Sequence, residues 1–298
     1  MNFKCGFVTI LGKPNVGKST LLNRLVGQKI SIVSPKPQTT RNVVTGILNG
    51  NDYQAVFLDT PGIHKSKNSL DKFMEKSIAK SLEGVDLIIY IIDGTKKFSV
   101  EILQEAQMYA NRGIPLILVV SKVDDSTIEK LYPELAKLNT MQNIKEIIPL
   151  SAFTGKNIDI LKENILKYLP EGPAMYPTDV STDSTQRFLA SEIVREKSLW
   201  LLQEEIPHGI AVQIETFKET EKLTKIDAII FCEKENHKRI IIGKNGEQLK
   251  KIAEESRKAL EKMVGQKVYL TLWVKVKERW RDSDIMASNM GYNKKDLD

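Results

Sequence analysis

Four short polar motifs punctuate the first half of this 298-residue chain, and each directly follows an apolar run of strand length. The motifs are GKPNVGKST at 12–20, DTPG at 59–62, SKVD at 121–124 and SAF at 151–153. The preceding runs are rich in Val, Ile and Leu, which is typical of parallel strands buried on both faces. They lie at 8–11, 55–58, 116–120 and 147–150. Because the carboxyl ends of parallel strands share one edge of a sheet, we expect the motifs to meet in one site.

The spacing of apolar residues predicts two domains. Two more strands are expected at 43–48 and 87–92. Over residues 1–169 the predicted strands alternate with helical patterns, which predicts a doubly wound, mostly parallel α/β sheet. Residues 170–185 contain three prolines and a Ser/Thr/Asp cluster, the composition of a linker. A smaller α+β domain follows at 186–281, and residues 282–298 are expected to form a C-terminal tail. In that smaller domain we predict a helix at 187–205, strands at 210–217 and 225–233, a short helix ending at 243, a helix at 247–264 and a strand at 268–276.

The first motif has the composition of a phosphate-binding loop. Gly12 and Gly17 frame it between a strand and a predicted helix at 20–26, so backbone N–H groups and the helix N-terminus can face a phosphate chain. Lys18 would reach the β- and γ-phosphates, and the Ser19 hydroxyl would ligate Mg²⁺. A glycine turn that binds nothing is the alternative, and the strand–loop–helix setting disfavours it.

The other three motifs add a metal-holding carboxylate and a selector for the base. Asp59 ends a strand, where its carboxylate can hold Mg²⁺, and the Gly62 N–H can meet a γ-phosphate. Asp124 can accept two hydrogen bonds from guanine, whereas adenine lacks that donor pair, so GTP is the predicted ligand. Lys122 would pack along the base, and a backbone N–H of the segment 151–152 would meet guanine O6.

A second signature lies in the smaller domain, where GKNG at 243–246 joins an apolar run to an amphipathic basic helix. In a KH domain such a loop lets a nucleic-acid backbone approach, and an apolar groove beside it takes about four unpaired bases. GxxG is common, so the prediction depends on the type II KH order of elements and on charge. Residues 234–281 carry 14 Lys and Arg against 6 Asp and Glu, an excess that attracts phosphate. The predicted RNA-binding residues are Ile242, Gly243, Lys244, Asn245, Gly246, Lys250 and Lys251.

Together these motifs resemble the translation-factor-related P-loop GTPases and, among them, the Era-type family of bacterial ribosome-assembly GTPases with a C-terminal KH domain. The likeness covers nearly the whole chain and includes PQTTRN at 37–42, REK at 195–197, IPHG at 206–209 and KVYLTLWVKVKERWR at 267–281. The resemblance implies an α/β P-loop GTPase domain and a type II KH domain. It also implies an enzyme that converts GTP to GDP and phosphate and binds single-stranded RNA near the 3′ end of 16S rRNA during 30S subunit assembly.

The resemblance extends to individual residues of the pocket. Thr40 of the first switch segment would join Ser19 and Asp59 on Mg²⁺, with Thr39 as the alternative, and Asn15 would hold a K⁺ ion that accelerates hydrolysis. Catalytic roles are expected for Lys18, Asn15, Thr40 and Gly62. The predicted GTP-binding residues are Gly12, Lys13, Pro14, Asn15, Val16, Gly17, Lys18, Ser19, Thr20, Asp59, Thr60, Pro61, Gly62, Ser121, Lys122, Val123, Asp124, Ser151 and Ala152.

Two positions depart from the family pattern. Ser121 stands where the family has Asn, and its shorter reach is expected to weaken the bracing of the phosphate loop. Ile63 stands where small signalling GTPases orient a water molecule with glutamine, which predicts slow intrinsic hydrolysis. Arg41 is interpreted as a mobile surface arginine rather than a catalytic one.

Composition sets the remaining expectations. Cys5 and Cys232 form no CxxC pair, and the longest apolar runs are about a third of a spanning helix, which predicts a reduced cytoplasmic protein. The N-terminus leads straight into the phosphate loop, so no signal peptide is expected. A net charge of +6 suits nucleic acid or anionic lipid. The predicted partners are 16S rRNA in the 30S subunit and, by peripheral contact, the cytoplasmic face of the inner membrane; a monomer is expected.

Three other functions compete with a GTP-hydrolysing switch. A non-enzymatic KH protein with a weak or regulatory nucleotide domain would gain support from the two departures, but the intact Lys18, Ser19, Asp59 and Asp124 disfavour it. A metabolic ATP-dependent kinase would need neither DTPG nor the KVD triplet. A tRNA-modification GTPase would need a C-terminal cysteine and an additional N-terminal domain.

Overall fold

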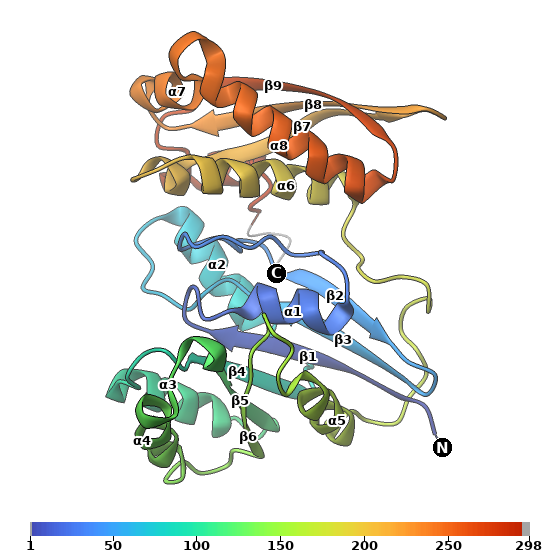
Figure 1. Cartoon of the computed structure of the whole chain (residues 1–298), viewed down its shortest axis with the longest axis vertical. Helices are drawn as coiled ribbons and strands as arrows, with labels where there is room; N and C mark the ends of the chain where they lie inside the picture. The colour runs from blue at the N-terminus through green and yellow to red at the C-terminus, as the bar shows by residue number, and fades with distance from the viewer. Residues whose placement is uncertain (1, 294–298) are drawn as a thin grey trace. The chain divides into compact units, whose positions relative to one another are not determined.

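The computed structural model describes residues 2–293, which form two compact units, each with its own core (Figure 1). The first unit contains Met1–Ser31, Thr40–His64 and Ser77–Asp183. The second contains Ser184–Asp298 together with two segments from the first half of the sequence, Ile32–Thr39 and Lys65–Lys76. The first switch segment expected from the sequence is therefore divided between the units at Thr40.

The first unit is built on a six-stranded sheet in the order β2-β3-β1-β4-β5-β6. All neighbouring pairs are parallel except β2 with β3, which confirms the mostly parallel sheet. The central strands β4 and β5 are buried along their whole length because their sequences, LIIYIID and LILVVS, consist almost entirely of Val, Ile and Leu. Their bounds are Lys4–Gly12 for β1, Val44–Asn49 for β2, Tyr53–Asp59 for β3, Leu87–Asp93 for β4, Leu116–Ser121 for β5 and Glu146–Pro149 for β6.

Helices cover both faces of this sheet (Figure 1). Side chains of α3 and α4 pack with Ile88, Tyr90 and Leu118 in one core cluster, whereas α1 contacts β1, β2 and β3, and α5 contacts β6. The helices are α1 (Lys18–Val26), α3 (Val100–Ala110), α4 (Ile128–Leu138) and α5 (Ile158–Tyr168), with a 3₁₀ turn, η1, at Val123–Asp125. Helix α2 (Ser69–Lys80) is divided between the units, because its residues up to Lys76 belong to the second unit.

The expected linker is packed against the first unit. The side chain of Gln54, fully buried on β3, accepts the N–H groups of Met175 and Tyr176 and donates to the Tyr176 carbonyl at 2.9 Å. The Ile47 N–H on β2 donates to Ser181 O at 2.8 Å. Residues up to Asp183 therefore extend the β2–β3 side of the sheet, which a composition rich in Pro and Ser does not reveal.

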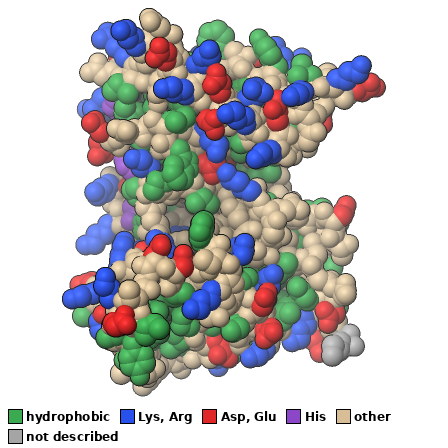
Figure 2. Space-filling model, viewed as in Figure 1, with side chains coloured by type: hydrophobic (Ala, Val, Ile, Leu, Met, Phe, Trp, Pro, Cys, Tyr) green, Lys and Arg blue, Asp and Glu red, His purple; other side chains and the backbone are tan. Residues whose placement is uncertain are grey.

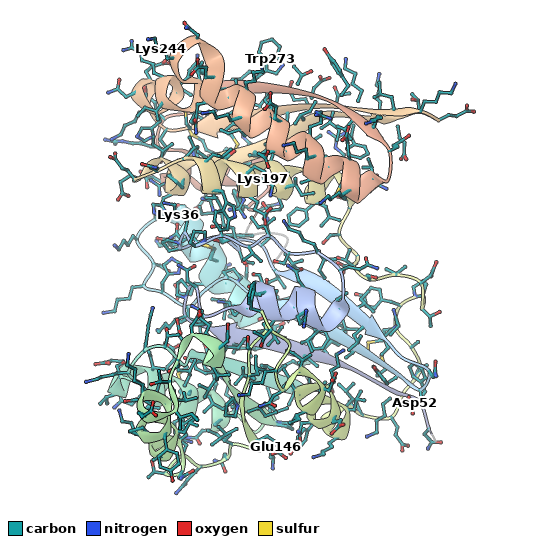
Figure 3. All side chains as sticks on the ribbon, in the orientation of Figure 1. Lys36, Asp52, Glu146, Lys197, Lys244 and Trp273 are labelled. Atoms are coloured by element: carbon teal, nitrogen blue, oxygen red, sulfur yellow. The ribbon has the colours of Figure 1, made fainter. Side chains whose placement is uncertain are left out.

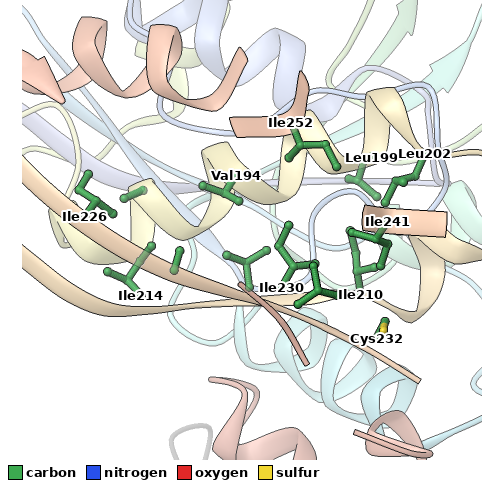
Figure 4. Packing of buried hydrophobic residues seen from close by; sticks show 14 of the residues in the cluster. Val194, Leu199, Leu202, Ile210, Ile214, Ile226, Ile230, Cys232, Ile241 and Ile252 are labelled. Carbon is green, nitrogen blue, oxygen red and sulfur yellow. The ribbon is translucent and has the colours of Figure 1, made fainter. Parts of the chain in front are cut away.

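The second unit contains a three-stranded sheet, β7-β8-β9, in which β8 is antiparallel to β7 and parallel to β9. Helices α6 and α8 pack on one face through a core of aliphatic side chains that includes Val194, Ile230 and Ile252 (Figure 4). The order of elements, helix–strand–strand–helix–helix–strand, is the predicted one. The bounds are α6 (Gln186–Leu201), η2 (Ile206–Gly209), β7 (Ala211–Glu219), β8 (Leu223–Cys232), α7 (Glu235–Ile242), η3 (Lys244–Gly246), α8 (Glu247–Val264) and β9 (Lys267–Val276).

The first part of the expected tail is folded. Residues after β9 form the 3₁₀ turn η4 (Trp280–Asp282) and helix α9 (Asp284–Asn289), and residues 294–298 lie outside the described part of the chain. Trp280 is fully buried, donates its indole N–H to Gly209 O at 2.9 Å and stacks on Tyr292 with ring centroids 5.7 Å apart. These aromatic contacts hold the segment against Ile229 and Phe231 of β8, so the expectation of a plain tail was wrong for residues 282–293.

Candidate nucleotide site and nucleic-acid loop

The predicted nucleotide motifs meet at one edge of the first sheet, where β1, β3, β5 and β6 end. The phosphate loop leaves β1 at Gly12, whose φ of +145° favours glycine. A Cβ atom at this position would lie only 2.5 Å from Ile91 O, so a larger residue would not fit. The loop then enters α1 at Lys18. This is the edge at which doubly wound folds bind ligands.

Lys18 is held inside the phosphate loop. Its Nζ donates to Gly12 O at 3.1 Å and to Lys13 O at 3.0 Å, and the residue is 6% exposed. Burial lowers the pKa of Lys18 to about 8, although the nearby Asp59 carboxylate opposes this shift. A buried ammonium enclosed by carbonyl groups is a suitable partner for phosphate oxygens.

Asp59 is the centre of a hydroxyl network. Its Oδ2 accepts from Ser19 Oγ at 2.6 Å and from Ser31 Oγ at 2.8 Å, and Ser19 Oγ lies 2.8 Å from Thr40 Oγ1. Burial raises the pKa of Asp59, while Lys18 and the two serine hydroxyls oppose that rise. The other carboxylate oxygen, Oδ1, is buried and has no hydrogen-bond partner among the described residues. A buried acceptor of this kind, beside two hydroxyl groups, fits the oxygen donor set that Mg²⁺ prefers.

The DTPG segment lies over the phosphate loop. Thr60 Oγ1 donates to Ile10 O at 2.7 Å, and the Ile63 N–H donates to Gly12 O at 3.1 Å. A Cβ atom on Gly62 would lie 2.7 Å from the Pro14 backbone, so only glycine fits so close to the loop. Ile63 packs against the apolar core of the unit and offers no polar side chain.

Ser121 braces the phosphate loop in spite of its short side chain. Its Oγ donates to Val16 O at 2.7 Å and to Ile92 O at 3.1 Å. The expectation that serine weakens this bracing is not supported, because β5 and the loop lie close enough for a hydroxyl to span them. Lys122 makes a second bridge, since its Nζ donates to Asn15 O at 2.7 Å and to Asp93 Oδ2 at 2.8 Å.

The residues predicted to recognise the base offer an exposed carboxylate, that of Asp124, and backbone N–H groups at Ser151 and Ala152. Asp124 is exposed in η1, directly after the Lys122 bridge. The Ser151 N–H donates to Lys156 O at 3.1 Å, so it is already used within the loop. Among the described residues the Ala152 N–H has no such partner, which makes Ala152 the better candidate donor of the predicted pair.

Sequence reasoning missed three residues of this site. Asp93 is the last residue of β4, at the same edge of the sheet, a position that could have identified it. Ser31 and Glu105 carry no local signal, because their partners are distant in sequence: Ser31 bonds Asp59, and Glu105 pairs with Lys13 and accepts from Tyr90 Oη. Arg41 was also misjudged, since it is 1% exposed rather than a surface arginine.

Thr39 and Thr40 differ clearly in their surroundings. Thr40 is 7% exposed and reaches Ser19, whereas Thr39 Oγ1 donates to Lys36 O at 2.6 Å within the second unit. In these positions Thr40 is the threonine beside the serine and carboxylate of the predicted metal site.

The GKNG loop of the second unit separates α7 from α8. Gly243, with φ +76°, and Asn245, with φ +52°, both have positive φ angles. Lys244 is exposed (Figure 3), and so is Asn245. Lys250 and Lys251 are exposed on α8, while Arg257 and Lys258 pair with Glu261 and Glu255. On the face that Figure 2 shows, Lys and Arg side chains are interspersed with Asp and Glu side chains.

Comparisons with known proteins match both units of the chain. A family model described as 50S ribosome-binding GTPase matches residues 7–122, and a KH domain model matches residues 205–281. GTPase Era of Clostridium botulinum (strain Okra / Type B1) is 49% identical over 299 residues, which cover 98% of this chain and 99% of that protein. GTPase Era of Clostridium kluyveri is 49% identical over 290 residues, which cover 97% of this chain and 99% of that protein.

Two solved structures are similar over the whole length. A crystal structure of Era in complex with MgGDPNP and nucleotides 1506–1542 of 16S ribosomal RNA has a TM-score of 0.94 and 42% identity, covering 98% of this chain and 99% of that one. A variant of Aquifex aeolicus Era bound to GDP·AlF₄⁻ has a TM-score of 0.93 and 43% identity, covering 98% and 100%. With these relatives, and with both family models matched in sequence order, the chain belongs to the Era family of GTPases.

Proposed function

We propose that this chain is a GTP-hydrolysing switch that binds single-stranded RNA near the 3′ end of 16S rRNA during assembly of the 30S subunit. The main support is that Ser19, Asp59 and Thr40 form a hydrogen-bonded network close to the buried Lys18 at the edge of the sheet. The same chain also has a KH domain. The Era structure bound to a GTP analogue and 16S RNA supports the same pairing of ligands.

Guanine selection is proposed for Asp124. Its exposed carboxylate follows the bridge from Lys122 to the phosphate loop, so the base and phosphate sites are mechanically connected. Asparagine at this position would replace one acceptor by a donor and would suit a base with a 2-oxo group. The test is a displacement assay with GTP, ATP and xanthosine triphosphate on wild type and Asp124→Asn. Equal binding of ATP and GTP by the wild type would contradict the proposal.

Mg²⁺ is proposed to bind at Ser19, Thr40 and Asp59, which supply two hydroxyl oxygens and one carboxylate. The buried Asp59 Oδ1, which lacks a partner in the described residues, supports this assignment. When bound, the ion would neutralise charge that develops on the phosphate oxygens. The role of the protein is to hold Lys18 among the phosphate oxygens and Gly62 against the loop, so that its N–H can meet the γ-phosphate.

Hydrolysis is proposed to be slow and to respond to K⁺. Ile63 cannot orient a water molecule, because its side chain is apolar and packs against the core. Asn15, whose carbonyl is fixed by Lys122, is the proposed K⁺ residue. Rates measured in K⁺ and Na⁺ buffers of equal ionic strength test this role. Identical rates would exclude it.

RNA binding is proposed for the GKNG loop. Negative charge at the two exposed loop positions, Lys244→Asp with Asn245→Asp, should repel the RNA backbone while leaving both glycines, which have positive φ angles, unchanged. We expect this variant to lose binding of 16S 3′-end RNA and to retain GTP binding. Changing the exposed Lys137 of α4 and Asn139, which caps the end of that helix, to Asp provides a matched control on the other unit. Unchanged RNA affinity in the loop variant would place the RNA elsewhere.

Location and oligomeric state stay predictions. No helix among the described residues is both long and apolar enough to cross a bilayer. A monomer in the cytoplasm, with peripheral contact at the inner membrane, is the arrangement that we propose. Flotation with anionic vesicles and analytical ultracentrifugation would test the membrane contact and the monomer separately.

A further inference from the structure

Strand β9 carries a part of the KVYLTLWVKVKERWR motif that neither the core nor the GKNG loop uses. The residues of this strand alternate between the two faces of the sheet. Val268 and Val274 are buried beneath α8, and Leu270 and Leu272 pack against the same core. The opposite positions, Tyr269 and Trp273, are 60% and 58% exposed.

The two exposed rings have no protein partner among the described residues. Of the three tryptophans, Trp200 donates its indole N–H to Val33 O, and Trp280 donates to Gly209 O, whereas Trp273 makes no hydrogen bond and no ring contact there. Tyr269 likewise makes none. Figure 3 shows Trp273 projecting from the outer surface of the second unit. Exposing two large aromatic side chains on one strand is unfavourable unless something covers them.

The chemistry around the rings favours nucleic acid. The outward positions of β9 read Lys267, Tyr269, Thr271, Trp273 and Lys275, and none of them is acidic. Four residues of a strand separate the two rings by about 13 Å, so each can stack on a different base. Lys267 at one end of the row can meet a phosphate. Lys275 at the other end pairs with the exposed Glu215 at 3.8 Å and can exchange that carboxylate for a phosphate.

Polar groups beside the rings argue against the alternative of a membrane surface. Thr271 lies between the rings, and on the neighbouring strand Lys225 pairs with Asp227 at 3.6 Å. A face that enters the lipid interface would need a continuous apolar area, which these groups interrupt. Stacking on separate bases requires only the two rings and nearby hydrogen-bonding groups.

We propose that the outward face of β9 is a second RNA contact, at which unpaired bases stack on Tyr269 and Trp273. This surface is on the side of the sheet opposite α8 and is separate from the GKNG loop. The proposal rests on the proposed RNA-binding function of the KH domain. It adds that an RNA strand longer than the loop can hold makes further contacts on β9.

The experiment compares two fluorescent RNAs from the 3′ end of 16S rRNA, of about four nucleotides, which the loop groove can hold, and about twelve nucleotides. For the full-length Tyr269→Ala, Trp273→Ala variant we expect affinity for the longer RNA to fall roughly 5- to 150-fold for each ring removed. Affinity for the shorter RNA should not change. Trp273→Phe should retain most of the affinity, because phenylalanine still stacks.

Controls distinguish failure of the β9 contact from failure of the proposed RNA-binding function. Tyr132→Ala removes another exposed aromatic side chain, 72% exposed on α4, and should leave both affinities unchanged. If wild type binds neither RNA, the proposed function itself fails. If wild type binds both and the double variant binds the longer RNA equally well, the β9 contact is refuted. Loss of binding to phosphatidylglycerol vesicles with unchanged RNA affinity would also refute it, in favour of a membrane surface.

Discussion

The bracing role of Ser121 can be tested by the change Ser121→Ala. The Ser121 hydroxyl is buried and connects the end of β5 to Val16 O of the phosphate loop and Ile92 O of β4. Alanine removes this donor without adding volume, so the variant isolates the hydrogen bonds. Because the loop must be ordered to bind phosphate, we expect the loss to appear in nucleotide affinity.

The size of the effect follows from the surroundings of the lost group. A buried hydrogen bond contributes about 0.5–1.5 kcal/mol, and a buried carbonyl left without a partner costs about 1–3 kcal/mol. The two carbonyl groups share one donor, and Val16 is 5% exposed, so water does not readily replace the hydroxyl. A total near 1.5 kcal/mol corresponds to a GDP dissociation constant raised roughly tenfold.

The assay is titration with a fluorescent GDP analogue, together with urea unfolding. Ser81→Ala is a matched control, since Ser81 is also 5% exposed and its Oγ donates to Ile78 O at 2.7 Å, away from the nucleotide motifs. We expect Ser81→Ala to lower the free energy of unfolding and leave GDP affinity unchanged. If Ser121→Ala binds GDP within twofold of wild type, the hydroxyl does not brace the loop.

Four further predictions concern the same unit. Asp93→Asn removes the carboxylate that orients Lys122 and should raise the GDP dissociation rate severalfold, as measured by stopped-flow. Burial pushes the pKa of Asp93 up, but hydrogen bonds from Lys122 and Thr95 outweigh it and hold this pKa below the usual aspartate value. The stabilisation that Asp93 gives is therefore complete above the pKa of an unfolded aspartate and is lost as the pH falls through the lowered pKa. The free energies of unfolding of wild type and variant in urea should converge in acid, and a constant difference would contradict this. Lys18, with a pKa of about 8, should react with an amine-acylating reagent near pH 8 faster than exposed lysines, because more of it is in the neutral amine form. GDP should suppress this reaction. Equal labelling of Lys18 and Lys130 would refute the lowered pKa of Lys18. Ser31→Ala should weaken the Mg²⁺ dependence of GDP dissociation by roughly tenfold, while Ser31→Thr, which keeps the hydroxyl, should restore it.

Local pattern was sufficient for most of the fold. Continuous Val, Ile and Leu runs located the strands of the first sheet, and α8 begins and ends where its apolar spacing predicts, from Glu247 to Val264. Motifs placed directly after strands met at one edge because parallel strands all point the same way. The long helix of the second unit was predicted too far, to residue 205, whereas α6 ends at Leu201.

Contacts between residues that are far apart in the sequence could not be predicted from local pattern. The linker segment looked free because Pro and Ser are common in it, yet Gln54, buried on β3, binds its backbone. Two residues of the same type within one motif also differ in burial, since Trp280 is fully buried and Trp273 is exposed. Burial of this kind depends on which elements pack together, and the sequence near each residue does not encode it.

The amino-acid order alone therefore determined the two-domain plan, the nucleotide motifs and the GKNG loop, because each depends on residues that are adjacent along the chain. Only the tertiary structure decided that a serine at 121 spans the gap to the phosphate loop and that Ser31 and Asp93 lie beside the predicted site residues. It also decided that the Ser151 N–H is used within its own loop, which leaves Ala152 as the candidate donor. Hydrogen bonds act over about 3 Å, and only packing of the whole unit brings distant residues within that range.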